Sequence, residues 1–217
     1  MTPPFEDRVR LFWERNSKAI LAFLALILVG IVVKGGWEYF AEQKERDIGK
    51  SFAEATTPAQ VKAFIAAHPG HTLAGVAQLR IADEAYAAGQ YADAIASYEQ
   101  AAKTIDTPAL SSRARLGLAM AKLQGGRAAD GEAALQAFAA DEKEIKAFRT
   151  EAAYHLTSLA ASKGNAAEVK TYSEQLMQID PASPWTQRAL QLLAASPVEE
   201  KAPPATDGAP TIKLPGK

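Results

Sequence analysis

Cysteine is absent from this chain of 217 residues. Its absence excludes disulfide bonds, thiolate nucleophiles and metal sites built from cysteine. It also excludes a lipid anchor attached through a cysteine side chain. Because a chain without cysteine suits reducing and oxidising compartments alike, the absence does not indicate on which side of a membrane the protein lies.

An excess of one charge is also lacking, since 24 Lys and Arg residues offset 25 Asp and Glu residues. A net charge of −1 gives no overall field that favours nucleic acid as a partner. Alanine, the best helix former and a poor strand residue, is frequent after residue 50. The composition therefore predicts an all-α fold, with residues 51–195 long enough for one domain with its own core.

Catalytic motifs are missing as well. The sequence has three histidines but no H-E-x-x-H motif, and no G-x-S-x-G turn for a serine nucleophile. Residues 126–132 have the spacing of a phosphate-binding loop, but Glu132 stands where the lysine is needed and would repel phosphate. The acidic residues Asp141, Glu142 and Glu144 are typical of a solvated face. We expect no enzyme activity, no cofactor and no metal ion.

One long apolar run is present, at residues 19–33, between Lys18 and Lys34. Eleven of its residues are Leu, Ile, Phe or Val, and together they favour membrane insertion by about 3 to 7 kcal/mol. With the glycines and Trp37 that follow, the run reaches the roughly 20 residues that cross a bilayer as a helix. Trp37, Tyr39 and Phe40 supply an aromatic belt at one interface. We predict a single membrane anchor over residues 17–40.

Two other interpretations of the run are less consistent with the sequence. A buried helix of a soluble protein more often breaks such a run with a polar residue. A cleaved signal peptide needs small residues at its cleavage site, whereas Trp37, Tyr39 and Phe40 follow the run. Orientation is not decided by charge, because four Lys or Arg residues precede the run and four follow it within residues 34–50. A short lead before a large domain favours a cytoplasmic amino terminus.

The lead, residues 1–16, places Phe5, Val9, Phe12 and Trp13 on one face of a helix. Such a helix either lies along the lipid headgroups or is an ordinary cytosolic stub. After the anchor, residues 41–56 predict a charged helical stalk. Thr57 and Pro58 are then typical of a helix start, as N-cap and first helical residue.

Residues 78–101 carry the most informative pattern. They predict two helices joined at Gly89, with Ala82 and Ala94 as small residues where the helices cross, and Tyr91 and Tyr98 filling the gaps. This pattern resembles a tetratricopeptide repeat, a pair of antiparallel helices that stacks on its neighbours into a solenoid. The usual tryptophan of the first helix is replaced here by Gln78, and the closing proline comes late, at Pro108.

Two weaker copies follow, with turns at Gly125-Gly126 and at residues 163–165. Ala94, Gly131 and Val169 occupy the small-residue position and are spaced by 37 and 38 residues, wider than the usual 34. We therefore expect longer turns between repeats or a slipped register. A last helix, residues 184–195, is expected to cover the final apolar face. The predicted helical solenoid, about three repeats plus this capping helix, spans residues 57–195, and residues 196–217 are predicted to be a disordered proline-rich tail.

The whole layout resembles the YfgM-like TPR family, ancillary subunits of the SecYEG translocon. The resemblance rests on the lead FWERNSKAI, the single anchor, GWEYF at its exit, an extra helix and degenerate repeats. It implies a bacterial inner-membrane protein with a cytoplasmic amino terminus and a periplasmic domain. The implied partners are the SecYEG translocon, a PpiD-like periplasmic chaperone and emerging polypeptides. A TPR scaffold for cell-envelope assembly, without a translocon role, is the alternative.

In TPR proteins the first helices of the repeats line the concave face, so this resemblance also implies where a partner binds. Our candidate contacts lie on the three predicted first helices, and any of them could instead be core or plain surface. They are Leu79, Asp83, Tyr86, Arg113, Met120, Tyr154 and Ser158.

Overall fold

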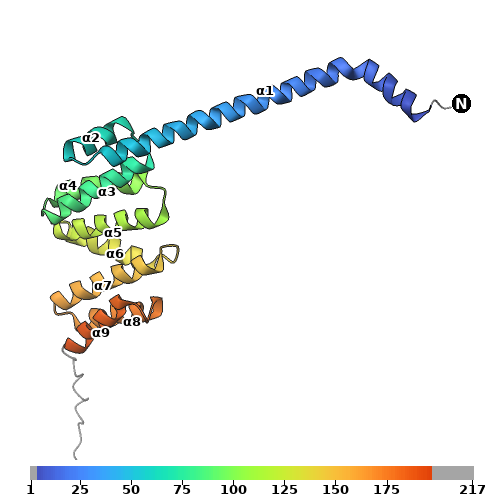
Figure 1. The fold of residues 1–217 in the computed structure, drawn as a ribbon. Coiled ribbons are helices and arrows are strands. Elements are labelled where there is room, and N and C mark those ends of the chain that lie inside the picture. Colours follow the sequence, from blue (N-terminus) through green and yellow to red (C-terminus); the bar gives the residue numbers. More distant parts are fainter. Residues whose placement is uncertain (1–3, 197–217) are drawn as a thin grey trace, which may run out of the picture. The chain divides into compact units, whose positions relative to one another are not determined.

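The computed structural model describes residues 4–196, and the predicted tail after Ser196 lies outside the described residues. The described part contains nine α-helices and no strand, which confirms the all-α prediction (Figure 1). The chain divides into two compact units, residues 1–69 and 70–217. The first unit holds α1 (Phe5–Glu54) and α2 (Pro58–Ala67). The second holds α3 (Thr72–Ala87), α4 (Tyr91–Thr104), α5 (Pro108–Gln124), α6 (Ala128–Ala140), α7 (Lys146–Ser162), α8 (Ala166–Ile179) and α9 (Pro184–Ala195).

Helix α1 joins the lead, the apolar run and the stalk in one element. It is a candidate membrane span by length and composition, and the most apolar part of it is not buried against other helices. Trp13 and Trp37 are both exposed. At about 1.5 Å of rise per residue they lie about 36 Å apart along the helix, a little more than the roughly 30 Å of a bilayer's hydrocarbon core. This length of helix is enough to reach from one side of a hydrocarbon core to the other.

The first unit ends in a short hairpin. Thr57 caps α2 as predicted, because its side chain accepts a hydrogen bond from the Gln60 backbone while the Gln60 side chain reaches back to the Thr57 backbone. Phe64 of α2 is buried and its ring lies 5.4 Å from that of Phe52 at the end of α1. The last turn of α1, at the end of the predicted stalk, therefore packs on α2 through an aromatic contact.

The second unit is a stack of three helix pairs, α3–α4, α5–α6 and α7–α8, followed by α9. Each pair turns at a glycine with a left-handed backbone: Gly89 (φ 72°), Gly126 (φ 81°) and Gly164 (φ 70°). The residue after each glycine donates its backbone N–H to a carbonyl five positions earlier, as at Gln90 to Ala85. The same helix-ending hydrogen bond recurs in all three pairs. The predicted repeats are confirmed.

Small residues lie where the two helices of a pair cross closely. Ala82 and Ala94 are both fully buried where α3 meets α4. A Cβ at Gly131 would lie 2.6 Å from the Leu123 backbone nitrogen, so α6 approaches α5 more closely than alanine allows. Val169, at the equivalent place of α8, is fully buried. The extra residues that separate the repeats lie partly in the connection 141–145, which is longer than the connection 105–107.

First helices lie on the inner side of the stack. Contacts link α3 with α5, α5 with α7 and α7 with α9, whereas each second helix contacts only its own first helix and the next one among the described residues. A curved stack brings its inner helices closer together than its outer ones. The inner face is therefore formed by α3, α5, α7 and α9.

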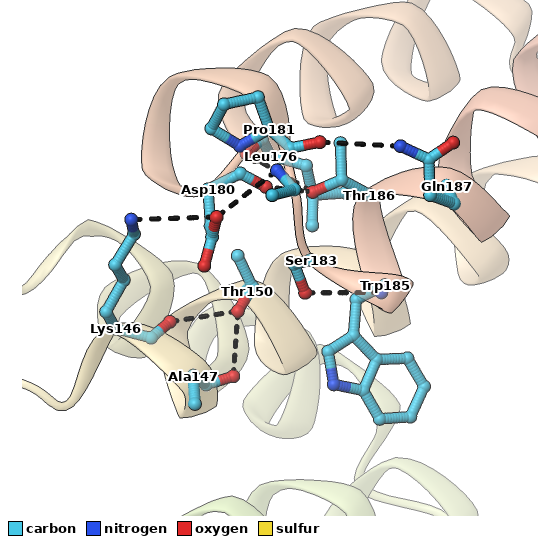
Figure 2. Close-up of polar contacts among 11 residues, drawn as sticks. Lys146, Ala147, Thr150, Leu176, Asp180, Pro181, Ser183, Trp185, Thr186 and Gln187 are labelled. Carbon is cyan, nitrogen blue, oxygen red and sulfur yellow. Dashed lines mark hydrogen bonds and ion pairs between the residues drawn. The ribbon is translucent and has the colours of Figure 1, made fainter.

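Helix α9 takes the place of the first helix of a fourth pair and is fixed by polar contacts (Figure 2). The Ser183 hydroxyl accepts from the Trp185 backbone N–H at 3.2 Å. The fully buried Thr186 donates to the Asp180 carbonyl at 2.6 Å, and Lys146 of α7 lies 3.6 Å from the Asp180 carboxylate. These contacts set the orientation of α9 and hence of Trp185.

The close approach of the Tyr98 ring to Gly117 predicts that a larger residue at position 117 lowers stability. A Cβ at Gly117 of α5 would lie 2.5 Å from Cε1 of the Tyr98 ring, which is buried and cannot swing away. We expect Gly117→Ala to lower the free energy of unfolding by about 1 to 3 kcal/mol through overpacking. Urea unfolding followed by circular dichroism measures it. Gly49→Ala on α1, where a Cβ meets nothing within 4 Å, is the control, and equal stability of the two variants would contradict the prediction.

Candidate functional site

The inner face contains a hollow of about 230 Å³ between α3, α5 and α7. We call it the inner groove. Polar, aromatic and apolar side chains line it together, mostly from first helices. Its lining residues are Asp83, Tyr86, Tyr98, Arg113, Leu116, Gly117, Met120, Glu151 and His155.

A hydrogen-bond network organises one side of the inner groove. The Tyr98 hydroxyl donates to Oδ1 of Asp83 at 2.5 Å, and the Arg113 guanidinium donates to the same oxygen at 3.1 Å. Tyr98 is 2% exposed, whereas the side chains of Arg113 and Asp83 are 44% and 41% exposed. Burial, followed by the hydrogen bond to Asp83 and its charge, raises the pKa of Tyr98 far above the ordinary tyrosine value. A buried phenol thus holds a salt bridge at the edge of the hollow.

Gly117 makes this network possible. Because it has no side chain, the Tyr98 ring of α4 can pass under α5 and bring its hydroxyl to the inner face. Of the lining residues that the structure describes, Tyr98 alone comes from a second helix. The close crossing therefore determines both the packing and the polar arrangement of the inner groove.

Tyr86 lies beside this network. Its ring packs edge-on against Tyr91, with 5.6 Å between ring centroids. Partial burial raises the pKa of Tyr86, and so does the nearby Tyr91, while the Arg113 charge opposes the shift. Tyr86 stays protonated and offers both a flat apolar ring and a hydroxyl.

The opposite side of the inner groove is formed by α7. Nε2 of His155 lies 3.8 Å from a carboxylate oxygen of Glu151, one helical turn away. The two side chains are 24% and 29% exposed. Leu116 and Met120 of α5 line the space facing them. This side of the hollow therefore has a partly desolvated carboxylate next to apolar surface.

An aromatic cluster continues the inner face from α7 to α9. The Trp185 ring lies 5.0 Å from Tyr154 and 6.1 Å from His155, between ring centroids. The Arg188 guanidinium stacks over Trp185 at 4.8 Å. All three rings are half-buried. The capping helix thus contributes to the same face as the repeats.

Comparison with protein families agrees with this geometry: the tetratricopeptide repeat-like domain family matches residues 10–153. The chain belongs to this family. No curated protein and no solved structure matches the chain. Since TPR-like domains are protein-interaction modules, membership implies protein partners in general, and the match does not distinguish a subfamily within it.

The TPR-like fold brings together four of the seven residues proposed from the sequence. Asp83, Tyr86, Arg113 and Met120 all line the inner groove. Tyr154 lies outside the lining, in the aromatic cluster with Trp185. That these five contact a partner stays a prediction.

The other two proposed residues lie elsewhere. Leu79 is 6% exposed and packs in the core of α3, α4 and α5, together with Ala114. Ser158 is half-buried on α7 and does not line the inner groove. On an alanine-rich helix several faces have similar hydropathy, so sequence periodicity did not distinguish the core side of α3 from its inner side.

Sequence reasoning did not single out Glu151, His155 or Trp185 as site residues. Glu151 and His155 do have a signal, because their spacing of four places them on one helix face beside Tyr154. Trp185 was expected only to cover the last repeat. Among residues 4–196 no group of three His, Cys, Asp or Glu side chains is arranged to hold a metal ion.

The Tyr98 network predicts a pH dependence of stability. In the unfolded chain Tyr98 ionises near pH 10, whereas in the folded protein its pKa is raised. Its contribution is therefore complete below pH 10 and is lost as pH rises toward the folded pKa, by up to about 1.4 kcal/mol per pH unit. We expect Tyr98→Phe to be less stable at pH 8 by about 1 kcal/mol, because a hydrogen bond is lost.

The difference between wild type and Tyr98→Phe should then shrink between pH 10 and 11. Urea unfolding at several pH values measures it. Tyr91→Phe serves as the control, since loss of the Tyr91 hydroxyl leaves the hydrogen bond from Tyr98 to Asp83 intact. A constant difference across this pH range would show that Tyr98 ionises alike in the folded and unfolded chain.

Proposed function

We propose that this protein is a membrane-anchored module that holds segments of other polypeptides in its inner groove. The observation that best supports this proposal is the hydrogen-bond network of Tyr98, Asp83 and Arg113. It fixes polar groups in position through a buried hydrogen bond, yet leaves Arg113 and Asp83 open to a partner. Groups that are ordered before binding lose little conformational entropy on binding. Tyr86 and Met120 add adaptable apolar contact beside them.

Binding rather than catalysis is favoured by the lining itself. His155 and Glu151 are adjacent, as a general base and its orienting carboxylate would be. The described lining contains no Ser, Thr, Cys or Lys that they could activate as a nucleophile. We therefore propose that the protein is not an enzyme.

Anchoring in a membrane would let a small groove bind its partner even where the affinity of the groove itself is low. Helix α1 confines the protein to a membrane, so a polypeptide that emerges there meets the inner groove at a raised effective concentration. We propose the bacterial inner membrane, with the amino terminus in the cytoplasm and the TPR-like domain in the periplasm. The proposed partners are the SecYEG translocon, a PpiD-like chaperone and emerging polypeptides. The support for these partners is the resemblance of the lead, anchor and repeats to YfgM-like proteins.

Photo-crosslinking in cells tests the groove. A crosslinking amino acid at Met120, inside the inner groove, should capture a partner, whereas one at Lys170, exposed on α8, should not. Tyr86→Ala and Tyr154→Ala should each weaken capture from Met120 severalfold without loss of helicity. Capture that is equal from Met120 and Lys170, or unchanged by both substitutions, would remove the groove from the function.

The identity of the captured proteins tests the proposed partners. Translocon subunits or a periplasmic chaperone are expected after mild detergent extraction and mass spectrometry. Recovery of cell-envelope assembly proteins alone would replace the translocon role with a scaffold role.

Protease treatment of spheroplasts tests the topology. We expect the TPR-like domain to be digested in intact spheroplasts while the lead is protected. Carbonate extraction should leave the full chain in the membrane fraction, and a variant lacking residues 1–40 should become soluble. Protection of the domain in intact spheroplasts would place it in the cytoplasm and exclude periplasmic partners.

A further inference from the structure

Glu151 is the least satisfied charge of the inner groove. Within residues 4–196 its carboxylate has one ion-pair partner, His155, at 3.8 Å, and that contact is an ion pair only when the imidazole is protonated. The side chain is 29% exposed, so much of its hydration is already lost. A carboxylate that is partly desolvated gains more from a cation than one on the open surface.

The other charges of the hollow are already matched. Asp83 accepts hydrogen bonds from both Arg113 and Tyr98, so that Asp83 and Arg113 form a neutral pair. Beyond the lining, Arg188 stacks over the Trp185 ring. Among the described lining residues, Glu151 is therefore the carboxylate that no Lys or Arg side chain pairs.

The space beside Glu151 suits a long side chain with an apolar stem. Leu116 and Met120 line it opposite α7. The hollow of about 230 Å³ exceeds the roughly 150 Å³ that accommodates a benzene-sized group. Lys and Arg pack their methylene stems on apolar surface while the charged end meets an acceptor.

We propose that Glu151 receives a lysine or arginine side chain from the polypeptide held in the inner groove. This inference rests on the proposed function and adds a chemical preference to it: a basic residue, with its stem against the partly buried Met120. His155 lies beside the Glu151 carboxylate, one helical turn along α7. An acidic or phosphorylated segment is disfavoured, because it would meet the Glu151 carboxylate, while the exposed Arg113 already shares its charge with Asp83.

A display library of random nine-residue peptides, selected on the full-length protein in nanodiscs, tests this preference. Selected peptides should be enriched in Lys or Arg at one position. One selected peptide is then synthesised with that residue and with norleucine in its place, which keeps the stem but removes the charge. Norleucine should weaken binding to the wild-type protein about fivefold to tenfold, the size expected for a partly desolvated ion pair.

Glu151→Gln makes the matched variant, because it keeps shape and removes charge. Against this variant the lysine and norleucine peptides should bind equally, within twofold. Glu174→Gln, an exposed carboxylate on α8 that pairs with Lys170, should retain the wild-type difference. His155→Gln should retain at least half of the lysine preference, since the carboxylate remains.

Each outcome separates the inference from the proposed function. Peptides that bind the inner groove without a basic preference, or with an acidic one, overturn the inference and leave the groove function standing. A lysine preference that persists in Glu151→Gln overturns it too, by assigning the cation to another group. Failure to select any peptide, together with unchanged crosslinking in Tyr86→Ala, overturns the proposed function itself.

Discussion

The structure depends on how closely helices cross within and between the pairs. Gly117 lets the Tyr98 ring pass under α5, and Gly131 brings α6 against the α5 backbone. Close crossing excludes water from the core of a domain that is rich in alanine and therefore buries little apolar area per residue. The same crossing carries the Tyr98 hydroxyl to the inner face, where it holds Asp83 and Arg113. Tyr98 thus takes part both in the packing of α4 on α5 and in the polar arrangement of the inner groove, so a change at Gly117 alters both.

Local features of the fold could be predicted from the sequence because their causes are local. The glycine at each turn, the Thr57 cap and the small residues at crossings each follow from the chemistry of a few neighbouring residues. The composition of the inner groove could not be predicted in the same way. Asp83, Arg113 and Glu151 come from three successive first helices, and their meeting depends on the connections 105–107 and 141–145. A shift of one residue along any of these helices would turn its polar side by about 100° about the helix axis and away from the inner groove.

The fold also shows how a closing helix can be part of the inner face. Helix α9 covers the last apolar surface, as a solenoid requires, but it does so from the position of a first helix, beside α7. Its first turn is held by Ser183, Thr186 and Asp180, so Trp185 is as firmly placed as residues of the repeats (Figure 2). The inner face therefore runs the length of the stack, with separate polar and aromatic parts.

The unequal crossings have a consequence for assembly of the fold. Ala94, Gly131 and Val169 place side chains of three different sizes at the equivalent crossing of the three pairs, although the turns that join the helices are alike. If the three second helices had the same residue at this crossing, one of them could pair with the wrong first helix, or with a first helix of another copy of the chain, at little cost in free energy. Valine in the glycine position would strike the α5 backbone, and glycine in the valine position would leave a void between α7 and α8. Because the repeats differ in sequence, each second helix packs better on its own first helix than on another, and this difference disfavours domain swapping.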